Sequence, residues 1–272
     1  MLVALISDVF FGSDARTRLS RRLQAAKADG AEIALLPEIP LDPWSPATSI
    51  PNPADAEAPD GPRHQMLSAC AREAQIGVVG GAIVIDPSTG KRHNTAVVFD
   101  EHGALVSTYR KVHLPDEDGF RESCHYEPGT TPPDVVRGFA LPFGIQICSD
   151  MNRPEGCHLL AAMGAAAILN PRATQASTYE RWKLVFRANA LTSTAYVLSV
   201  ARPAPEQGVP LGGASIAIDP NGDVIAESID PIVLVRLDEQ VIADARRRYP
   251  GYLTLYPDLY AQGWSAVAAR RT

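Results

Sequence analysis

Short apolar runs alternate with amphipathic helical patterns along most of the chain. Residues 2–10 form the first apolar run and predict a strand, and a second buried strand is predicted at residues 33–36. The segment between them predicts a helix, with Ser13 or Asp14 as a possible N-cap and Gly30 at its end. Three apolar residues follow helical spacing in this segment, namely Leu19, Leu23 and Ala26.

A proline-rich segment follows the second predicted strand. Eight prolines fall between residues 37 and 62. Because proline cannot donate to a strand ladder and interrupts a helix, this segment predicts a long ordered loop. The loop begins beside Glu38, so we expect it to shape a pocket there.

The middle of the chain predicts one helix and three successive strands. The helix is expected at residues 63–76. The three strands are expected at residues 78–85, 95–100 and 104–110. Because only short turn-forming segments, DPSTGK and EHG, separate these strands, antiparallel or mixed pairing is predicted.

The second half of the chain continues the alternation of strands and helices. A loop over residues 112–133 precedes an apolar strand that ends at Cys148, and the helix that follows is stopped by Gly164. A further strand is predicted at residues 165–170 and a further helix at residues 178–192. Four more strands are predicted at residues 195–201, 214–219, 223–228 and 232–237.

This order of elements predicts the fold class and the domain organisation. Many strands with interspersed helices favour an α/β (α+β) fold in which two packed sheets are covered by outer helices. The chain has 272 residues, of which 46% are hydrophobic and 21% are charged. No linker or internal repeat divides it, so one domain is predicted over residues 1–272.

Composition and charge argue against several classes of partner. A formal net charge of −6 gives no general attraction to nucleic acid or to anionic membranes. The apolar start contains Asp8 and lacks a cationic segment, so it favours a strand over a secretory signal. No apolar stretch approaches the ~20 residues that span a bilayer. The four cysteines form no dense pattern, which predicts a reducing, cytoplasmic setting.

Three reactive residues lie just beyond apolar runs: Glu38, Lys111 and Cys148. Together they could attack a carbonyl-like carbon, with the Cys148 thiolate as nucleophile, Glu38 as general base and Lys111 stabilising the oxyanion. Taken singly, Glu38 could be a solvated loop carboxylate and Lys111 a surface lysine. However, Glu38 directly follows the buried run IALL, where an unpaired charge would be costly.

Cys148 also has a structural interpretation. A lone cysteine after a strand is most often a small buried hydrophobe. A turn into a helix favours the reactive alternative, because helix N-terminal N–H groups lower a thiol pKa, and the Ser149 N–H would donate to the oxyanion. His113 could equally act as a base for the thiol.

Candidate substrate-binding residues are Arg172, Trp44 and Tyr179. Arg172 could pair with a surface carboxylate, or it could clamp a carboxylate of the substrate in a bidentate way. Trp44 and Tyr179 could be pocket walls or ordinary packing residues. The pairs Cys124-His125 and Cys157-His158 lack the spacing of structural zinc sites, so no metal and no other cofactor is predicted.

The segments around the three reactive residues resemble blocks of the nitrilase, or carbon-nitrogen hydrolase, superfamily. GAEIALLPE is similar to the first block of that superfamily, STYRKVHLP to its lysine block, and CSDMNRPE to its cysteine block. The order and separations agree, and the resemblance runs almost from end to end. It implies a Glu38-Lys111-Cys148 triad in a four-layer α-β-β-α sandwich.

The resemblance also implies further site residues and an assembly. The segment ESCHYEPG matches the family spacing that identifies Glu122 as a second catalytic glutamate, although Asp116, Glu117 and Asp118 lie close in sequence. The family histidine at the position of His113 is mainly structural. A homodimer or larger oligomer is implied, with contacts from the helix after Cys148, the helix at 178–192 and a C-terminal tail at about 247–272.

The implied activity is cysteine-dependent hydrolysis of a non-peptide C–N bond in a small amide or N-carbamoyl compound. It would proceed through a thioester and release ammonia or an amine. The sequence CSD with PE after it is similar to the amidase and N-carbamoyl amidohydrolase branches rather than to nitrilases. Alternatives are a nitrilase, a thioester acyl transferase and, from another class, a catalytically silent binding protein.

Overall fold

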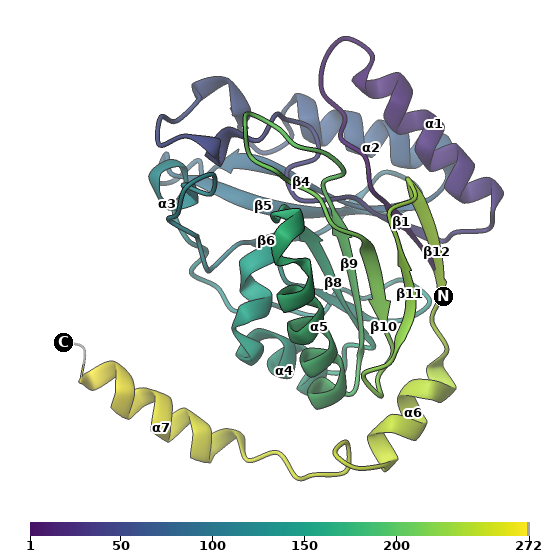
Figure 1. The fold of residues 1–272 in the computed structure, drawn as a ribbon, viewed down its shortest axis with the longest axis vertical. Helices are drawn as coiled ribbons and strands as arrows, with labels where there is room; N and C mark the ends of the chain where they lie inside the picture. The colour runs from purple at the N-terminus through teal and green to yellow at the C-terminus, as the bar shows by residue number, and fades with distance from the viewer. Residues whose placement is uncertain (271–272) are drawn as a thin grey trace.

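Two β-sheets packed face to face form the centre of the protein, and helices cover the outer face of each sheet (Figure 1). These features come from a computed structural model, which describes residues 1–270. Because helices and sheets each bury one apolar face, this layered arrangement places every apolar face against another.

The first sheet has seven strands in the order β12-β1-β2-β4-β5-β6, with β3 beside β4. Its strands are β1 (Leu2–Ile6), β2 (Ile33–Leu35), β3 (Ala56–Glu57), β4 (Gly77–Ile85), β5 (Arg92–Phe99), β6 (Leu105–Arg110) and β12 (Ile232–Arg236). β1, β2 and β4 are parallel, whereas β4, β5 and β6 form an antiparallel meander. The predicted antiparallel or mixed pairing of the three middle strands is therefore confirmed.

The second sheet has five strands in the order β11-β10-β9-β8-β7. Its strands are β7 (Phe143–Ile145), β8 (Ala167–Arg172), β9 (Tyr196–Ala201), β10 (Ser215–Ile218) and β11 (Val224–Ser228). β7, β8 and β9 are parallel, with α4 (Pro154–Ala162) and α5 (Tyr179–Ser193) as the crossovers between them. The carboxyl ends of these three strands therefore lie at one edge of the sheet.

Three hydrophobic clusters hold the four layers together. α1 (Ala15–Ala28) and α2 (Pro62–Ala74) pack on the first sheet, and α4 and α5 pack on the second. The helical face predicted for α1 is buried, including Leu19 and Leu23. Side chains of both sheets, such as Leu35 and Leu198, form the core between them. The four-layer α-β-β-α sandwich is therefore confirmed.

Several elements differ from their predicted bounds. The first strand ends at Ile6, because the chain then turns so that the Phe10 N–H donates to the carbonyl of Pro40 at 2.6 Å. The segment at 37–62 contains two 3-10 turns, Ser45–Ala47 and Pro53–Asp55, in addition to β3. By contrast, the helix predicted at residues 154–164 is confirmed as α4, and residues Cys148–Asn152 form a 3-10 turn just before it.

Three α-helices of the described chain were not predicted from the sequence: one lies inside the predicted loop at 112–133, and two lie in the C-terminal region. The remaining α-helices are α3 (Glu122–His125), α6 (Glu239–Arg247) and α7 (Pro257–Ala269). α7 projects away from both sheets (Figure 1), and its large apolar side chains, including Leu259 and Trp264, are exposed. The last two residues of the predicted oligomer tail, 271 and 272, lie outside the described residues.

The strand that leads to Cys148, β7, packs closely against α4. A Cβ atom added at Gly144 in β7 would lie 2.4 Å from the Leu160 side chain, which is fully buried in α4. Gly144→Ala should therefore lower the free energy of unfolding by about 1–3 kcal/mol through overpacking, as measured by denaturant or thermal unfolding. The control is Gly263→Ala in α7, where nothing lies within 4 Å. Equal stability of both variants would contradict the prediction.

Candidate active site

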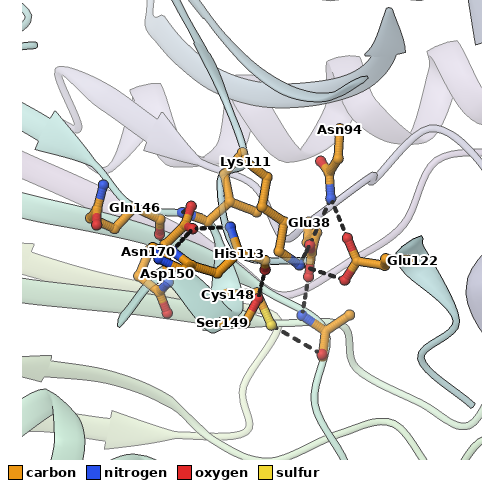
Figure 2. Close-up of polar contacts among 12 residues, drawn as sticks. Glu38, Asn94, Lys111, His113, Glu122, Gln146, Cys148, Ser149, Asp150 and Asn170 are labelled. Atoms are coloured by element: carbon orange, nitrogen blue, oxygen red, sulfur yellow. Dashed lines mark hydrogen bonds and ion pairs between the residues drawn. The ribbon is translucent and has the colours of Figure 1, made fainter. Parts of the chain in front are cut away.

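Lys111 lies at the centre of a buried ionic cluster just beyond β6. Its Nζ donates to Glu38 Oε1 at 2.7 Å and to Glu122 Oε1 at 2.5 Å, and all three side chains are almost completely buried (Figure 2). Burial alone would lower the pKa of the Lys111 ammonium, but the charges of Glu122 and Glu38 outweigh it and raise this pKa well above its usual range. Lys111 is therefore a permanent cation held between two carboxylates.

Glu38, directly after β2, accepts hydrogen bonds at both carboxylate oxygens. Besides Lys111, the Asn94 side chain donates to Oε1 at 2.8 Å, and the backbone N–H of Ala173 donates to Oε2 at 2.9 Å. Ala173 follows β8 in the second sheet, so this carboxylate joins the two sheets. These contacts hold the proposed base in one orientation.

Arg202, the residue after β9, fixes the backbone that carries Glu38. Its guanidinium donates to the carbonyls of Glu38 at 2.9 Å, Ile39 at 2.5 Å and Asp42 at 2.9 Å. It also pairs with Glu206 at 2.6 Å. Ile39 has a positive φ of 46°, an unfavourable conformation for a β-branched residue that these contacts stabilise.

Glu122 begins α3 and shares the contacts of Glu38. Its Oε2 accepts from the Asn94 side chain at 3.1 Å, while Oε1 accepts from Lys111. Burial raises the pKa of Glu122 to about 7, a shift that Lys111 opposes and the charge of Glu38 supports. Asn94, in β5, thus bridges the two carboxylates that flank Lys111.

Cys148 follows β7 at a sharp turn in the chain. Its φ is +44°, which places a non-glycine residue in the left-handed region and presents the side chain at a bend. Its Sγ donates to the carbonyl oxygen of Ala173 at 3.4 Å. Burial raises the pKa of the Cys148 thiol well above its usual range; the Glu38 carboxylate acts in the same direction and Lys111 opposes. The resting sulfur is therefore a thiol.

Asp150 connects the turn at Cys148 to the segment that carries Lys111. Its fully buried carboxylate accepts from the backbone N–H of His113 at 2.9 Å and from His113 Nδ1 at 2.8 Å (Figure 2). It also accepts from the Tyr109 hydroxyl at 2.8 Å and from the Ile147 N–H at 3.2 Å. His113 is therefore engaged with Asp150 in the structure.

The Ser149 amide is a candidate oxyanion donor. Within residues 1–270 this N–H has no hydrogen-bond acceptor, whereas the Ser149 hydroxyl donates to the carbonyl of His113 at 2.5 Å. An unpaired amide next to a nucleophile, with the Lys111 ammonium in the same site, can stabilise negative charge on a tetrahedral intermediate.

Taken together, the site holds two carboxylates that share one cation, a cysteine at a sharp turn of the backbone, and an amide donor next to that cysteine. The comparisons with known proteins fit this arrangement. A model of the family described as carbon-nitrogen hydrolase matches residues 14–247.

The chain belongs to the carbon-nitrogen hydrolase family.

Individual relatives agree with this assignment. The chain is 32% identical to the human protein named omega-amidase NIT2 over 262 residues, which cover 92% of each chain. The solved structure of Saccharomyces cerevisiae Nit3, described as a member of branch 10 of the nitrilase superfamily, aligns with a TM-score of 0.77 and 30% identity over 92% of this chain and 94% of that one. The predicted family and the predicted enzyme class, an amidase-type carbon-nitrogen hydrolase, are confirmed.

A more distant structure supports the fold alone. The carbon-nitrogen hydrolase of Helicobacter pylori G27 aligns with a TM-score of 0.84 at 19% identity, over 96% of this chain and 97% of that one.

The structure brings together all four predicted catalytic residues of this carbon-nitrogen hydrolase, and Ser149 lies beside one of them. Of the three predicted pocket residues, Arg172 is fully buried and donates to protein acceptors. Trp44 is also fully buried, with its indole Nε1 donating to the carbonyl of Gly119 at 2.8 Å. The Tyr179 hydroxyl donates to Glu227 at 2.9 Å. Substrate binding by these three residues stays a prediction.

Four contributors to the site were not predicted from the sequence: Asn94, Asp150, Ala173 and Arg202. Asn94 lies between His93 and Thr95 in the polar first half of β5, and Ala173 contributes only its backbone. Asp150 lies within the CSD block, and Arg202 follows an apolar strand as Glu38 does. Their positions in the sequence could therefore have identified both as site residues. Across residues 1–270, no group of three or more His, Cys, Asp or Glu is arranged to hold a metal ion.

The raised pKa of Glu122 generates a pH prediction. As the pH falls through about 7, Glu122 takes up a proton and its hold on Lys111 weakens, so kcat/KM of the native protein should fall with it. Glu122→Gln should lower kcat/KM above this pH by at least about tenfold, equivalent to about 1.4 kcal/mol, and should abolish the acid-side decrease. The measurement is a pH profile of amide hydrolysis.

The matched control for this profile is Glu117→Gln, because Glu117 is exposed and close in sequence. It should retain the native profile. An unchanged acid-side decrease in Glu122→Gln would assign the titration to another group.

Proposed function

We propose that the protein hydrolyses the C–N bond of a small amide or N-carbamoyl compound through a thioester on Cys148. The observation that carries the proposal is the Lys111 ammonium buried between Glu38 and Glu122, with the Cys148 thiol and the Ser149 amide beside it. Because buried charges are costly unless they are paired, such a cluster is typical of a catalytic site. The relatives named omega-amidase favour an amide over a nitrile.

Acylation begins when Glu38 accepts the Cys148 proton and the sulfur attacks the carbonyl carbon. The negative charge that develops on the carbonyl oxygen is stabilised by Lys111 and the Ser149 N–H. The C–N bond then breaks as Glu38 returns the proton to the departing nitrogen. Ammonia or an amine leaves, and the acyl group remains on the sulfur as a thioester.

Deacylation uses the same groups in the reverse sense. Glu38 accepts a proton from water, whose oxygen attacks the thioester carbon, while Glu122 keeps Lys111 in place. The C–S bond breaks and the sulfur regains a proton as the acid is released. Every proton and bond is thus accounted for by the residues of the site.

The mechanism predicts cysteine-dependent release of ammonia. A panel of ω-amides, simple amides, N-carbamoyl compounds and nitriles should show ammonia release by the native protein, and Cys148→Ala should reduce it at least about 10³-fold. The control is Cys124→Ala, because Cys124 is exposed and outside the ionic cluster. If no compound of the panel releases ammonia and iodoacetamide does not alkylate Cys148, the results would instead support a catalytically silent binding protein.

We also propose that the protein is a cytoplasmic homodimer or larger homo-oligomer. The outer helices α4 and α5 expose Leu159, Met163, Leu184 and Leu191, and α7 exposes an apolar face. Exposed apolar patches of this kind are typical of protein contacts. The four cysteines are free, as expected of a reducing compartment. None of the helices within residues 1–270 has the length and hydropathy needed to cross a membrane.

The assembly proposal predicts that α7 contributes to the subunit contact. Trp264→Asp and Leu259→Asp should shift the mass measured by light scattering toward that of a monomer, because each places a charge in the apolar face. The control is Ser265→Asp, which adds the same charge to the other side of α7. Native protein that is monomeric at every concentration tested would contradict the proposal.

A further inference from the structure

Arg172, the last residue of β8, is a fully buried cation without a carboxylate partner. Its Nε donates to Ser199 Oγ at 2.9 Å and its Nη1 to Thr174 Oγ1 at 2.6 Å. The remaining contacts are with the carbonyls of Gly212, at 3.5 Å, and Ala214. All of these acceptors are neutral, and Arg172 makes no ion pair with any of residues 1–270.

The other two fully buried cations near the site differ from Arg172 in this respect. Lys111 is balanced by two carboxylates and Arg202 by Glu206. Burial lowers the pKa of Arg172 to about 10, so it still carries its positive charge at neutral pH. A buried charge without an oppositely charged partner is costly, so we expect the Arg172 charge to have a role in the site.

The residue next to Arg172 touches both the proposed base and the proposed nucleophile. The Ala173 N–H donates to Glu38, and the Ala173 carbonyl accepts from the Cys148 sulfur. Because the guanidinium is hydrogen-bonded to Thr174 on the far side of Ala173, it holds both flanks of this peptide in place.

A second hydrogen-bond path leads from Arg172 to the strand before Cys148. The Ser199 hydroxyl, which accepts from Arg172, donates to Asn170 Oδ1 at 2.7 Å. Asn170 Nδ2 donates in turn to the carbonyl of Gln146 at 2.6 Å. Gln146 stands two residues before Cys148, so the path reaches the bend that presents the thiol.

The protein also builds a fitted cage around this guanidinium. The Tyr179 and Phe186 rings lie at 5.6 Å and 5.7 Å from its central carbon. Gly213 has a positive φ of 101°, and a Cβ atom there would lie 3.2 Å from Tyr179 and 3.4 Å from Arg172 Nη1. A larger residue would crowd the cage, so the glycine permits this close approach.

We propose that Arg172 is a positioning residue that orients the Ala173 peptide between Glu38 and Cys148 and supplies positive charge to the Cys148 thiolate. The charged groups that face Cys148 are the carboxylates of Glu38 and Glu122 and the cations of Lys111 and Arg172. When Glu38 accepts the thiol proton, the thiolate and Glu122 carry two negative charges and Lys111 carries one positive charge. The Arg172 charge offsets one of them, whereas a carboxylate clamp on substrate would need donors that Arg172 already uses.

The test is the pH dependence of iodoacetamide alkylation at Cys148, measured in a Cys124→Ala background and assigned by peptide mass mapping. Arg172→Gln should raise the apparent pKa of the Cys148 thiol by about one unit, and so lower alkylation about tenfold at a fixed pH below it. Arg172→Lys keeps the charge and should show a near-native alkylation profile. Its kcat should nevertheless fall about tenfold or more, with KM changed little, because lysine cannot hold Ser199 and Thr174 together.

The control is Arg246→Gln, since Arg246 is a half-buried arginine on α6, outside the site, that donates to the Ala165 carbonyl. It should leave both readouts unchanged. A native alkylation profile in folded Arg172→Gln, with KM raised only for carboxylate-bearing amides, would show that Arg172 binds substrate and would overturn the proposal. Native kcat in Arg172→Lys would overturn the positioning role.

This inference rests on the proposed function only in treating Cys148 as the nucleophile. Alkylation requires no turnover, so loss of amide hydrolysis and loss of the Arg172 effect are separate outcomes. If Arg172→Gln does not fold, the Arg172→Lys variant decides through its alkylation profile and kcat.

Discussion

The Lys111 ammonium shared by two carboxylates in a solvent-excluded interior is the interaction on which the rest of the site depends. Removing one member of a buried ionic group typically costs about 3–5 kcal/mol, because the remaining charges are left without a partner. Here one cation faces two anions, so the cluster of Lys111, Glu38 and Glu122 carries a net negative charge. The Asn94 amide group and the Ala173 N–H offset that excess by donating to the carboxylates.

The two-sheet architecture makes this site possible, because the first sheet supplies the ionic group and the second supplies the proposed nucleophile. Glu38 and Lys111 follow β2 and β6 of the first sheet, whereas Cys148 follows β7 of the second. Several contacts connect the halves; among them, Ala173 donates to Glu38, and Asp150 accepts from the backbone after Lys111. The relative placement of base and thiol is therefore fixed by the packing of one sheet on the other.

Three reactive members of the site were predicted because each follows an apolar run: Glu38, Lys111 and Cys148. A polar or reactive residue just after an apolar strand suggests a functional role. The family spacing identified Glu122. Asn94 was not predicted because a polar residue at the start of a strand looks like an ordinary edge position. No side-chain pattern could reveal Ala173, since only its backbone acts.

The fold shows the same division between local and long-range information. Alternating apolar runs and helical patterns were enough for the layers, because each element buries its own face locally. The antiparallel pairing of β1 with β12 joins the two ends of the domain and leaves no local signature. α7 was not predicted, and its large apolar side chains, such as Leu259 and Trp264, are exposed rather than packed in a core.

The electrostatics of the resting site explain why its parts must act together. In the proposed cycle Cys148 is a thiol at rest, because burial and the nearby carboxylate raise its pKa. Glu38 is held by three hydrogen-bond donors in that state. As negative charge develops on the substrate carbonyl oxygen, the Lys111 ammonium interacts with that oxygen as well as with Glu38. Proton transfer from the thiol is then favoured only as the sulfur attacks, so the same lysine couples activation of the nucleophile to the presence of a substrate carbonyl.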